Sequence, residues 1–332
     1  MMADPVLTLA WLVLAHLAAD FILQTRGMAR DKFQSGRRAW RGLAAHLGGV
    51  TLCLLPVPVA FGVPGLAFLL AVVIAHAVID RAKIVWTRHA EAVAIVQAHR
   101  QHEAAPGPEG LGSAWTPVPA ALFVGDQLAH LGVIAWAWAV WLSAAPLTSA
   151  WVSVAGAAMG AWDPAIVART TLVSLVLLDL AIVNVRAADM FVATLVHPRE
   201  VVTGHEAGVG QEAATGHHAD GGEAVVPGSP VVDGSPVVTG STVVTGSAVQ
   251  PVSRAPSPAR IGATIGVLER LLIVAFVLTG AQAAIGFVVA AKTLARFKQL
   301  DDRQFAEYYL LGTLASVSVA LGTGLLAVAA LR

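Results

Sequence analysis

The sequence predicts an all-α protein, a polytopic bundle of transmembrane helices with seven spans, or eight if one long apolar stretch crosses the membrane twice. Of its 332 residues, 56% are hydrophobic and only 13% are charged, whereas soluble domains carry about 25% charged residues. The mean hydropathy is +0.71. Several apolar stretches also reach the roughly 20 residues that a helix needs to cross a bilayer core of about 30 Å.

Charge and cysteine content exclude several classes of function. The formal net charge is zero, so no basic field favours nucleic acid as a partner. Cys53 is the single cysteine, which excludes an internal disulfide and a cysteine-based zinc site. The N-terminal segment MMADPVLTLAW lacks the basic residues of a secretory signal, so we expect it to enter a retained first span. We therefore expect a multi-pass protein of the cell (inner) membrane whose main partner is the lipid bilayer.

The first three spans are predicted at residues 6–24, 42–60 and 66–86. Between the first two lies a loop with six basic residues and one acid, Asp31. Such loops stay on the cytoplasmic side, which places the N-terminus outside. Residues 87–115 are expected to begin as a helical extension and to end in the Pro/Gly loop APGPEGLG.

The next apolar stretch, residues 120–161, contains only two ionisable residues, Asp126 and His130. Its length allows one span plus a surface or re-entrant helix, or two short spans divided near Pro146. A further span is predicted at residues 164–185.

The last two helices are predicted at residues 261–298 and 305–331. The loop between them is basic, with residues Lys292, Arg296, Lys298 and Arg303. If five spans precede the linker, strict alternation places this loop outside, in conflict with the positive-inside rule. If residues 120–161 form two spans, this loop lies inside and the conflict disappears. Both seven and eight spans therefore stay open.

Residues 197–260 are a different kind of sequence. They contain no Leu, Ile, Phe, Met, Trp or Tyr, and they hold the repeats VVPGSP, VVDGSP, VVTGST and VVTGSA. Without large apolar side chains such a segment cannot offset its chain entropy, which predicts a disordered linker. The chain is therefore expected to divide into a four-span module (1–145), further membrane helix or helices (146–196), this linker, and a two-helix membrane module (261–332).

Ionisable residues recur inside the first four apolar stretches. They are His16 with Asp20, His46, His76 with Asp80, and Asp126 with His130. Residues four apart share one helix face. Counted from the basic ends of the spans, His46, His76 and Asp20 lie roughly 7 to 9 Å deep and His16 roughly 15 Å deep, and Asp80 directly precedes a basic residue. Because ionisable groups in hydrocarbon are costly and usually functional, we expect them to converge in one cavity in the cytoplasmic third of the membrane.

His and Asp together suit a divalent metal such as Zn, Mn or Fe. The predicted metal ligands are His16, His46, His76, Asp126 and His130. The predicted catalytic carboxylates are Asp20 and Asp80, one of which would act as general base for a bound water in a metal-dependent hydrolase. Four flanking residues are candidates for binding the headgroup or phosphate of a lipid or small-molecule substrate: Gln24, Lys32, Lys83 and Gln127. Glu269 is a further polar candidate.

Two other functions fit the same residues. Chains of Asp and His also relay protons in transporters, so a proton- or ion-coupled transporter is the first alternative. The second is a non-catalytic membrane scaffold, in which the polar network only holds the helices together. The sequence does not choose a protein partner for any of the three.

The motifs HLAADFILQ (16–24), HAVIDRAK (76–83) and DQLAH (126–130) together resemble an uncharacterised bacterial membrane family, domain of unknown function 3307. C-terminal segments such as AEYYLLGTLASV (306–317) resemble longer members of it. The resemblance covers about residues 6–145 and 261–325, with the repeat-bearing linker as an insertion. It implies a polytopic bacterial inner-membrane protein and supports the same His and Asp residues, without assigning them a chemistry.

Overall fold

The computed structural model describes residues 3–104, 116–196 and 258–332. All regular elements in these ranges are helices, which confirms the predicted all-α class. Seven helices are long and apolar enough to cross a membrane: Pro5–Leu23, Gly36–Phe61, Val63–Gln101, Val118–Leu142, Pro164–Val196, Ile261–Leu278 and Phe305–Leu331. The described part of the chain is thus built as a polytopic membrane protein, as expected.

The first span is α1 (Pro5–Leu17), continued by the π-helical turn η1 (Ala18–Leu23). Asp4 caps α1 by accepting a hydrogen bond from a first-turn backbone N–H at 2.8 Å, and proline at the first helical position needs no such partner. Single π-helical turns inside helices often occur at functional sites. Here the turn carries Asp20.

The basic loop after the first span folds into the short helix α2 (Arg26–Lys32), which packs closely on α3 (Gly36–Leu54). A Cβ at Gly42 of α3 would lie 2.7 Å from the backbone N of Lys32 and 2.8 Å from the Cβ of Asp31. Only glycine therefore permits this approach. The contact holds α2 against the bundle and leaves Lys32 only 6% exposed.

The second span ends in α4 (Pro56–Phe61), and Gly62, with φ +64°, reverses the chain into α5 (Val63–Ala104). The 42 residues of α5 measure about 63 Å, so the helix exceeds a bilayer core. Residues 87–104 are thus the predicted helical extension. The rest of the predicted loop, residues 105–115, lies outside the described residues.

Residues 118–159 form one span and one short helix. The span is α6 (Val118–Ala137) with the π-helical turn η2 (Trp138–Leu142), and α7 (Ser149–Met159) follows. The Thr148 hydroxyl donates a hydrogen bond to the Val59 carbonyl at 2.8 Å, which ties the start of α7 to α4. Of the two predicted arrangements, the structure has the single span with an additional short helix.

The fifth span is longer than predicted. It consists of α8 (Pro164–Ile182), the π-helical turn η3 (Val183–Ala187) and α9 (Ala188–Val196), so it continues beyond the expected end at residue 185. Asn184, near the predicted end, donates side-chain hydrogen bonds to the Leu180 carbonyl at 3.0 Å and to the Thr323 hydroxyl at 3.2 Å. The predicted linker, residues 197–260, lies outside the described residues except for its last three, which already belong to the next helix.

The predicted single helix at residues 261–298 is wrong. The chain forms α10 (Pro258–Leu278), turns at Gly280 (φ +77°), and returns through the 3-10 turn η4 (Gln282–Ala284) and α11 (Ile285–Ala295). A second 3-10 turn, η5 (Phe297–Gln299), leads into α12 (Arg303–Leu331). Hydropathy alone does not reveal this turn, because the residues on both sides of it are equally apolar.

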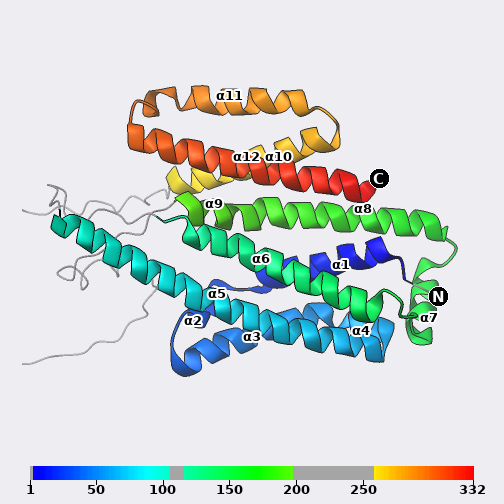
Figure 1. Cartoon of the computed structure of the whole chain (residues 1–332). Helices are drawn as coiled ribbons and strands as arrows, with labels where there is room; N and C mark the ends of the chain where they lie inside the picture. The colour runs from blue at the N-terminus through cyan, green and yellow to red at the C-terminus, as the bar shows by residue number, and fades with distance from the viewer. Residues whose placement is uncertain (1–2, 105–115, 197–257) are drawn as a thin grey trace, which may run out of the picture. The chain divides into compact units, whose positions relative to one another are not determined.

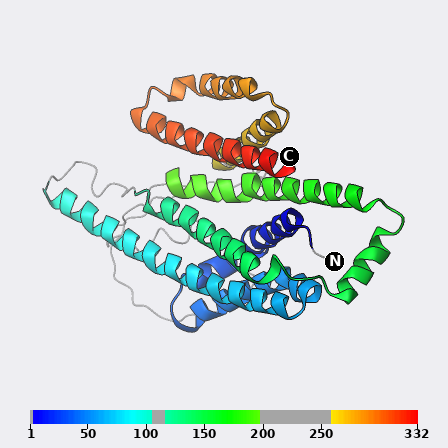
Figure 2. The same ribbon diagram turned by 45° about the vertical axis from the view of Figure 1, so that its right-hand side comes forward.

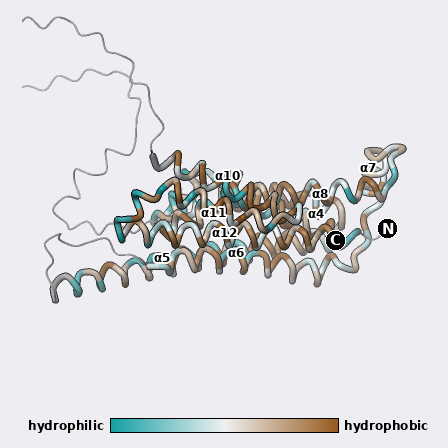
Figure 3. The backbone as a smooth tube through the Cα atoms, turned by 90° about the horizontal axis from the view of Figure 1, so that it is seen from above, coloured by the Kyte–Doolittle hydropathy of each residue, from teal (hydrophilic) through white to brown (hydrophobic). Residues whose placement is uncertain are grey.

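This reversal places the last basic loop at the same end as the others. The Lys292 ammonium of α11 lies 2.6 Å from the Glu269 carboxylate of α10, so α11 runs back along α10. A Cβ at Gly312, early in α12, would lie 3.2 Å from Val196 at the end of α9. Figures 1 and 2 show the three C-terminal helices running in alternating directions, and Figure 3 shows hydrophilic residues gathered toward that end. The predicted conflict with the positive-inside rule therefore disappears.

The apolar core lies toward the opposite end. Leu12, Phe68 and Ala137 are 0% exposed and pack together between α1, α5 and α6. A second core joins α8 to α10 and α12 through residues such as Ile273 and Ala320. The polar residues of the first four spans thus lie between an apolar half and a basic end.

The close approach of α2 to α3 gives a direct test. We expect Gly42→Ala to destabilise the protein by about 1–3 kcal/mol, because the added methyl group overpacks the contact with Asp31 and Lys32. Gly48→Ala on the same helix meets no atom within 4 Å and is expected to be neutral or stabilising by up to about 1 kcal/mol. Unfolding in detergent measures the free energy of unfolding of both variants. Equal stability of the two would contradict the close packing of α2 on α3.

Candidate metal centre

All seven predicted His and Asp residues meet at one buried centre. They come from α1 with η1, α3, α5 and α6, and none is more than 9% exposed. The set is His16, Asp20, His46, His76, Asp80, Asp126 and His130. Pairs spaced four residues apart lie one turn apart on a single helix face, as their spacing predicts.

The four imidazole rings are packed against each other. The Nε2 atoms of His46 and His76 are 2.9 Å apart. The ring centroids of His76 and His130 are 4.0 Å apart, and those of His16 and His130 are 5.1 Å apart. Two facing imidazole nitrogens at this distance either share a proton or direct their lone pairs at a common cation.

The carboxylate of Asp20 faces this pair of nitrogens. Its Oδ1 lies 3.5 Å from the Nε2 of His46 and 3.5 Å from the Nε2 of His76. The Oδ2 of Asp80 lies 3.6 Å and 3.9 Å from the same two nitrogens. Two triangles of potential ligand atoms therefore share the edge between the two histidines.

These separations fit a metal ion. Ligand atoms that are about 2.0–2.2 Å from a tetrahedral zinc ion lie roughly 3.3–3.6 Å from one another. The triangle of Asp20 Oδ1, His46 Nε2 and His76 Nε2 has edges of 3.5, 3.5 and 2.9 Å. Small adjustments of side chains would bring the shortest edge to the expected length, so the residues present suit such a group.

Three buried atoms of the centre have no hydrogen-bond partner among the described residues. They are Asp20 Oδ1, Asp126 Oδ1 and His130 Nε2. Buried polar atoms are nearly always paired. The other ring nitrogen of His130 donates to the backbone carbonyl of Asp126 at 2.9 Å, which leaves Nε2 as an acceptor. Metal-binding histidines typically have this arrangement.

Two lysines supply the positive charge around the centre. The Lys32 ammonium donates to Asp80 Oδ2 at 2.7 Å and to the Gln24 side-chain carbonyl at 2.8 Å. The Lys83 ammonium donates to Asp126 Oδ2 at 2.6 Å. Sequence reasoning found these lysines as flanking residues, but the structure adds that each forms an ion pair with one carboxylate of the centre.

Gln127 connects the carboxylates to a histidine. Its amide N–H donates to Asp126 at 3.0 Å and to Asp20 at 3.5 Å. Its carbonyl oxygen lies 3.3 Å from His16 Nε2 and therefore accepts a hydrogen bond from that ring. The Nδ1 of His16 then presents a lone pair toward Asp20, 3.8 Å away, an arrangement that a cation would stabilise.

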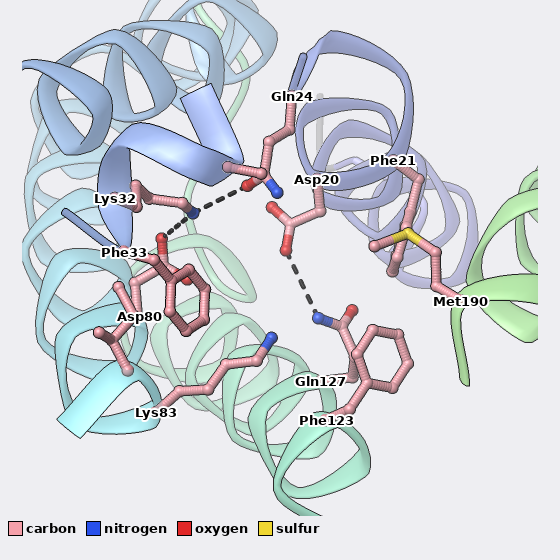
Figure 4. Close-up of a pocket in the computed structure, with 12 residues that line it drawn as sticks. Asp20, Phe21, Gln24, Lys32, Phe33, Asp80, Lys83, Phe123, Gln127 and Met190 are labelled. Atoms are coloured by element: carbon pink, nitrogen blue, oxygen red, sulfur yellow. Dashed lines mark hydrogen bonds and ion pairs between the residues drawn. The ribbon is translucent and has the colours of Figure 1, made fainter. Parts of the chain in front are cut away.

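A pocket borders the centre on the side of α2 (Figure 4). Its polar lining consists of Asp20, Gln24, Lys32, Asp80, Lys83 and Gln127. Its apolar lining consists of Phe21, Ala29, Phe33, Ile84, Phe123 and Met190. The pocket thus connects the buried His and Asp residues to the basic end of the bundle.

Glu269 does not join this centre. It pairs with Lys292 within the C-terminal helices. Its neighbour Arg270 is the buried residue of that region, with 2% exposure, and donates to the Asn184 carbonyl at 2.7 Å and to Ser316 at 3.3 Å. Sequence reasoning did not place Arg270 in the interior, because charged residues near the start of a span usually mark the membrane edge.

The ion pair of Lys32 gives a second test. In metal-free protein, Lys32→Met leaves the buried Asp80 carboxylate without its partner, so we expect a loss of about 3–5 kcal/mol in the free energy of unfolding. Lys32→Met/Asp80→Asn removes both charges and is expected to recover most of it. A double variant no more stable than Lys32→Met, measured by unfolding in detergent, would show that the pair does not govern this region.

Comparison with known proteins agrees with the motifs. The model of a family described as a protein of unknown function (DUF3307) matches residues 8–158. No curated protein and no solved structure matches the chain. The C-terminal segments that resemble longer family members lie beyond the match, so that part of the resemblance stays a prediction. The matched segment contains every His and Asp of the centre, so the similarity to the DUF3307 family covers all the residues that build it.

Proposed function

We propose that this protein is a metal-dependent hydrolase of the inner membrane, with one divalent ion held by His and Asp residues. The observation that carries the proposal is the triangle of Asp20 Oδ1, His46 Nε2 and His76 Nε2, whose edges of 2.9–3.5 Å suit a tetrahedral ion. A divalent ion in such a site acidifies a water molecule to a pKa of about 7, so hydrolysis can proceed near neutral pH.

The distances suggest a division of roles that differs from the sequence-based expectation. Asp20 was expected to be catalytic, yet its Oδ1 lies as close to both histidines as a third ligand would. Asp80 lies beside the same nitrogens and lines the pocket. We therefore assign Asp20 to the ligand set and Asp80 to the acceptance of a proton from water. His16 and His130 complete the ring of imidazoles around the site.

The charge balance also favours one divalent cation. Three carboxylates and two ammonium groups leave one net negative charge at the centre when the histidines are neutral. An uncompensated negative charge is costly in a protein interior within hydrocarbon. A divalent ion converts this to one net positive charge, which hydroxide or an anionic substrate would then neutralise.

The one-sided distribution of polar residues favours an enzyme over a transporter. Between the centre and the opposite end, the segments 5–15, 47–61, 63–75 and 131–142 contain no histidine and no acidic or basic residue. The side chains there, such as Leu12 and Phe68, form the apolar core. A proton relay needs polar groups on both sides of its binding site, whereas an enzyme needs access from one side only.

The orientation of the bundle in the membrane follows from the distribution of its basic segments. The segments 26–41, 81–100 and 292–303 are basic and lie at the end of the bundle that the pocket faces. The positive-inside rule assigns that end to the cytoplasm. The pocket would then receive its substrate from the cytoplasmic leaflet or the cytosol.

Metal analysis tests the proposal. Detergent-purified protein, prepared without chelators and offered Zn, Mn or Fe, is expected to retain about one ion per chain. We expect His46→Ala and His76→Ala to lower the affinity more than about 100-fold, since even second-shell changes cost 10–100-fold. Elemental analysis and equilibrium dialysis measure both quantities.

His99→Ala is the matched control. His99 lies on the same helix as His76 but is exposed on its extension, so this variant should bind metal like the wild type. Circular dichroism and gel filtration establish that each variant is folded. If folded wild-type protein takes up none of the three metals, or if both centre variants retain the ion, the hydrolase proposal fails.

A further inference from the structure

We propose that the pocket beside the metal centre binds the phosphate group of an amphiphilic phosphate monoester, with Lys32 and Lys83 as the phosphate-binding residues. This inference deepens the proposed hydrolase function and rests on it for the reaction. The binding itself follows from the lining of the pocket, which combines ammonium groups on one side with aromatic and aliphatic side chains on the other.

Both ammonium groups have hydrogen-bond donors to spare. Lys32 uses two N–H groups, for Gln24 and Asp80, and Lys83 uses one, for Asp126, among the described residues. An ammonium has three N–H groups, so one remains on Lys32 and two on Lys83. Figure 4 shows both side chains directed into the pocket. Three donors on two cations match the three terminal oxygens of a phosphate monoester.

The charge of the loaded centre selects an anion. With a divalent ion bound, the site has one net positive charge, because three carboxylates face two ammonium groups and the ion. The lysines lie 2.6–2.7 Å from their carboxylates, so they can share their remaining N–H groups without giving up these ion pairs. Lysine is a common phosphate-binding residue in such sites. An uncharged ester would leave both the net charge and the spare donors unused.

The apolar side of the pocket predicts the rest of the substrate. Phe33 lies directly after α2 and is 42% exposed, whereas Phe123 lies deeper, with its ring 5.1 Å from the Lys83 ammonium. Met190 of α9 adds a flexible apolar wall. A ligand whose phosphate meets the lysines would therefore lay its alkyl chain along these side chains at the membrane boundary.

The reaction on such a substrate is hydrolysis of the phosphate ester bond. The oxygen of water forms a bond to phosphorus, and the bond between phosphorus and the alcohol oxygen breaks with its electron pair on that oxygen. Asp80 accepts one proton of the water, and this proton ends on the departing alcohol. The products are a free amphiphilic alcohol, which stays in the membrane, and inorganic phosphate.

Binding of two probes to zinc-loaded protein in a maltoside detergent tests the inference. We expect decyl phosphate to bind at least 10-fold more tightly than inorganic phosphate, because only decyl phosphate contacts the apolar wall. Phe123→Ala should remove most of this difference and leave the affinity for inorganic phosphate unchanged. Isothermal titration measures all four affinities.

The role of Lys83 in phosphate binding is tested in a variant that keeps the net charge of the centre unchanged. Lys83→Met/Asp126→Asn removes both members of one ion pair, so neither charge is left alone in the interior. We expect it to weaken binding of both probes at least 10-fold, whereas Lys298→Met, at an exposed position in η5, should have no effect. Decyl alcohol, the uncharged analogue, should bind at least 10-fold more weakly than decyl phosphate.

Zinc content, measured on the same samples, separates the two proposals. Zinc-loaded wild type that binds neither probe would overturn the phosphate inference and leave the metal site standing. Unchanged affinity in Lys83→Met/Asp126→Asn, or equal binding of decyl alcohol, would exclude the lysines as phosphate ligands. Equal affinity for inorganic phosphate and decyl phosphate would show that the apolar lining does not bind an alkyl chain, and would exclude an amphiphilic substrate. Protein that takes up none of Zn, Mn and Fe would instead contradict the hydrolase proposal itself.

Discussion

The cost of burying carboxylates inside a membrane bundle governs this structure. Asp20, Asp80 and Asp126 are each at most 9% exposed, and an unpaired charge in such a place would favour unfolding or neutralisation. The ammonium groups of Lys32 and Lys83 compensate two of these carboxylates, at distances of 2.6–2.7 Å. The third carboxylate, that of Asp20, faces histidines and the Gln127 amide but no ammonium group. This imbalance of charge is the physical basis for a metal ion.

Several features of the backbone serve this balance. Gly42 lets α2 approach α3 closely enough to bury Lys32, and the π-helical turn η1 carries Asp20 to the imidazole pair. On the far side, Arg270 holds α10 to the carbonyl of Asn184 in η3. The next helix, α9, then contributes a side chain to the pocket wall. The C-terminal helices thus support the pocket without contributing to the His and Asp set.

The sequence predicted the parts that local spacing determines. His and Asp four residues apart had to share a face, and their depth from the basic loops placed them at one level, so the centre could be predicted. The ion pair between Lys32 and Asp80 could not be predicted from the sequence, because it depends on a tertiary contact at Gly42. The turn at Gly280 was missed since apolar residues continue on both sides. The fifth span continues through η3 and α9 beyond its predicted end at residue 185.

X-ray absorption spectroscopy of zinc-loaded protein identifies the atoms that bind the ion. We expect four nitrogen and oxygen ligands at about 2.0–2.1 Å, with the outer-shell scattering of two imidazole rings. In His46→Ala/His76→Ala that imidazole scattering should disappear. A spectrum of the wild type with only oxygen ligands and no imidazole contribution would contradict a metal centre built on Asp20, His46 and His76.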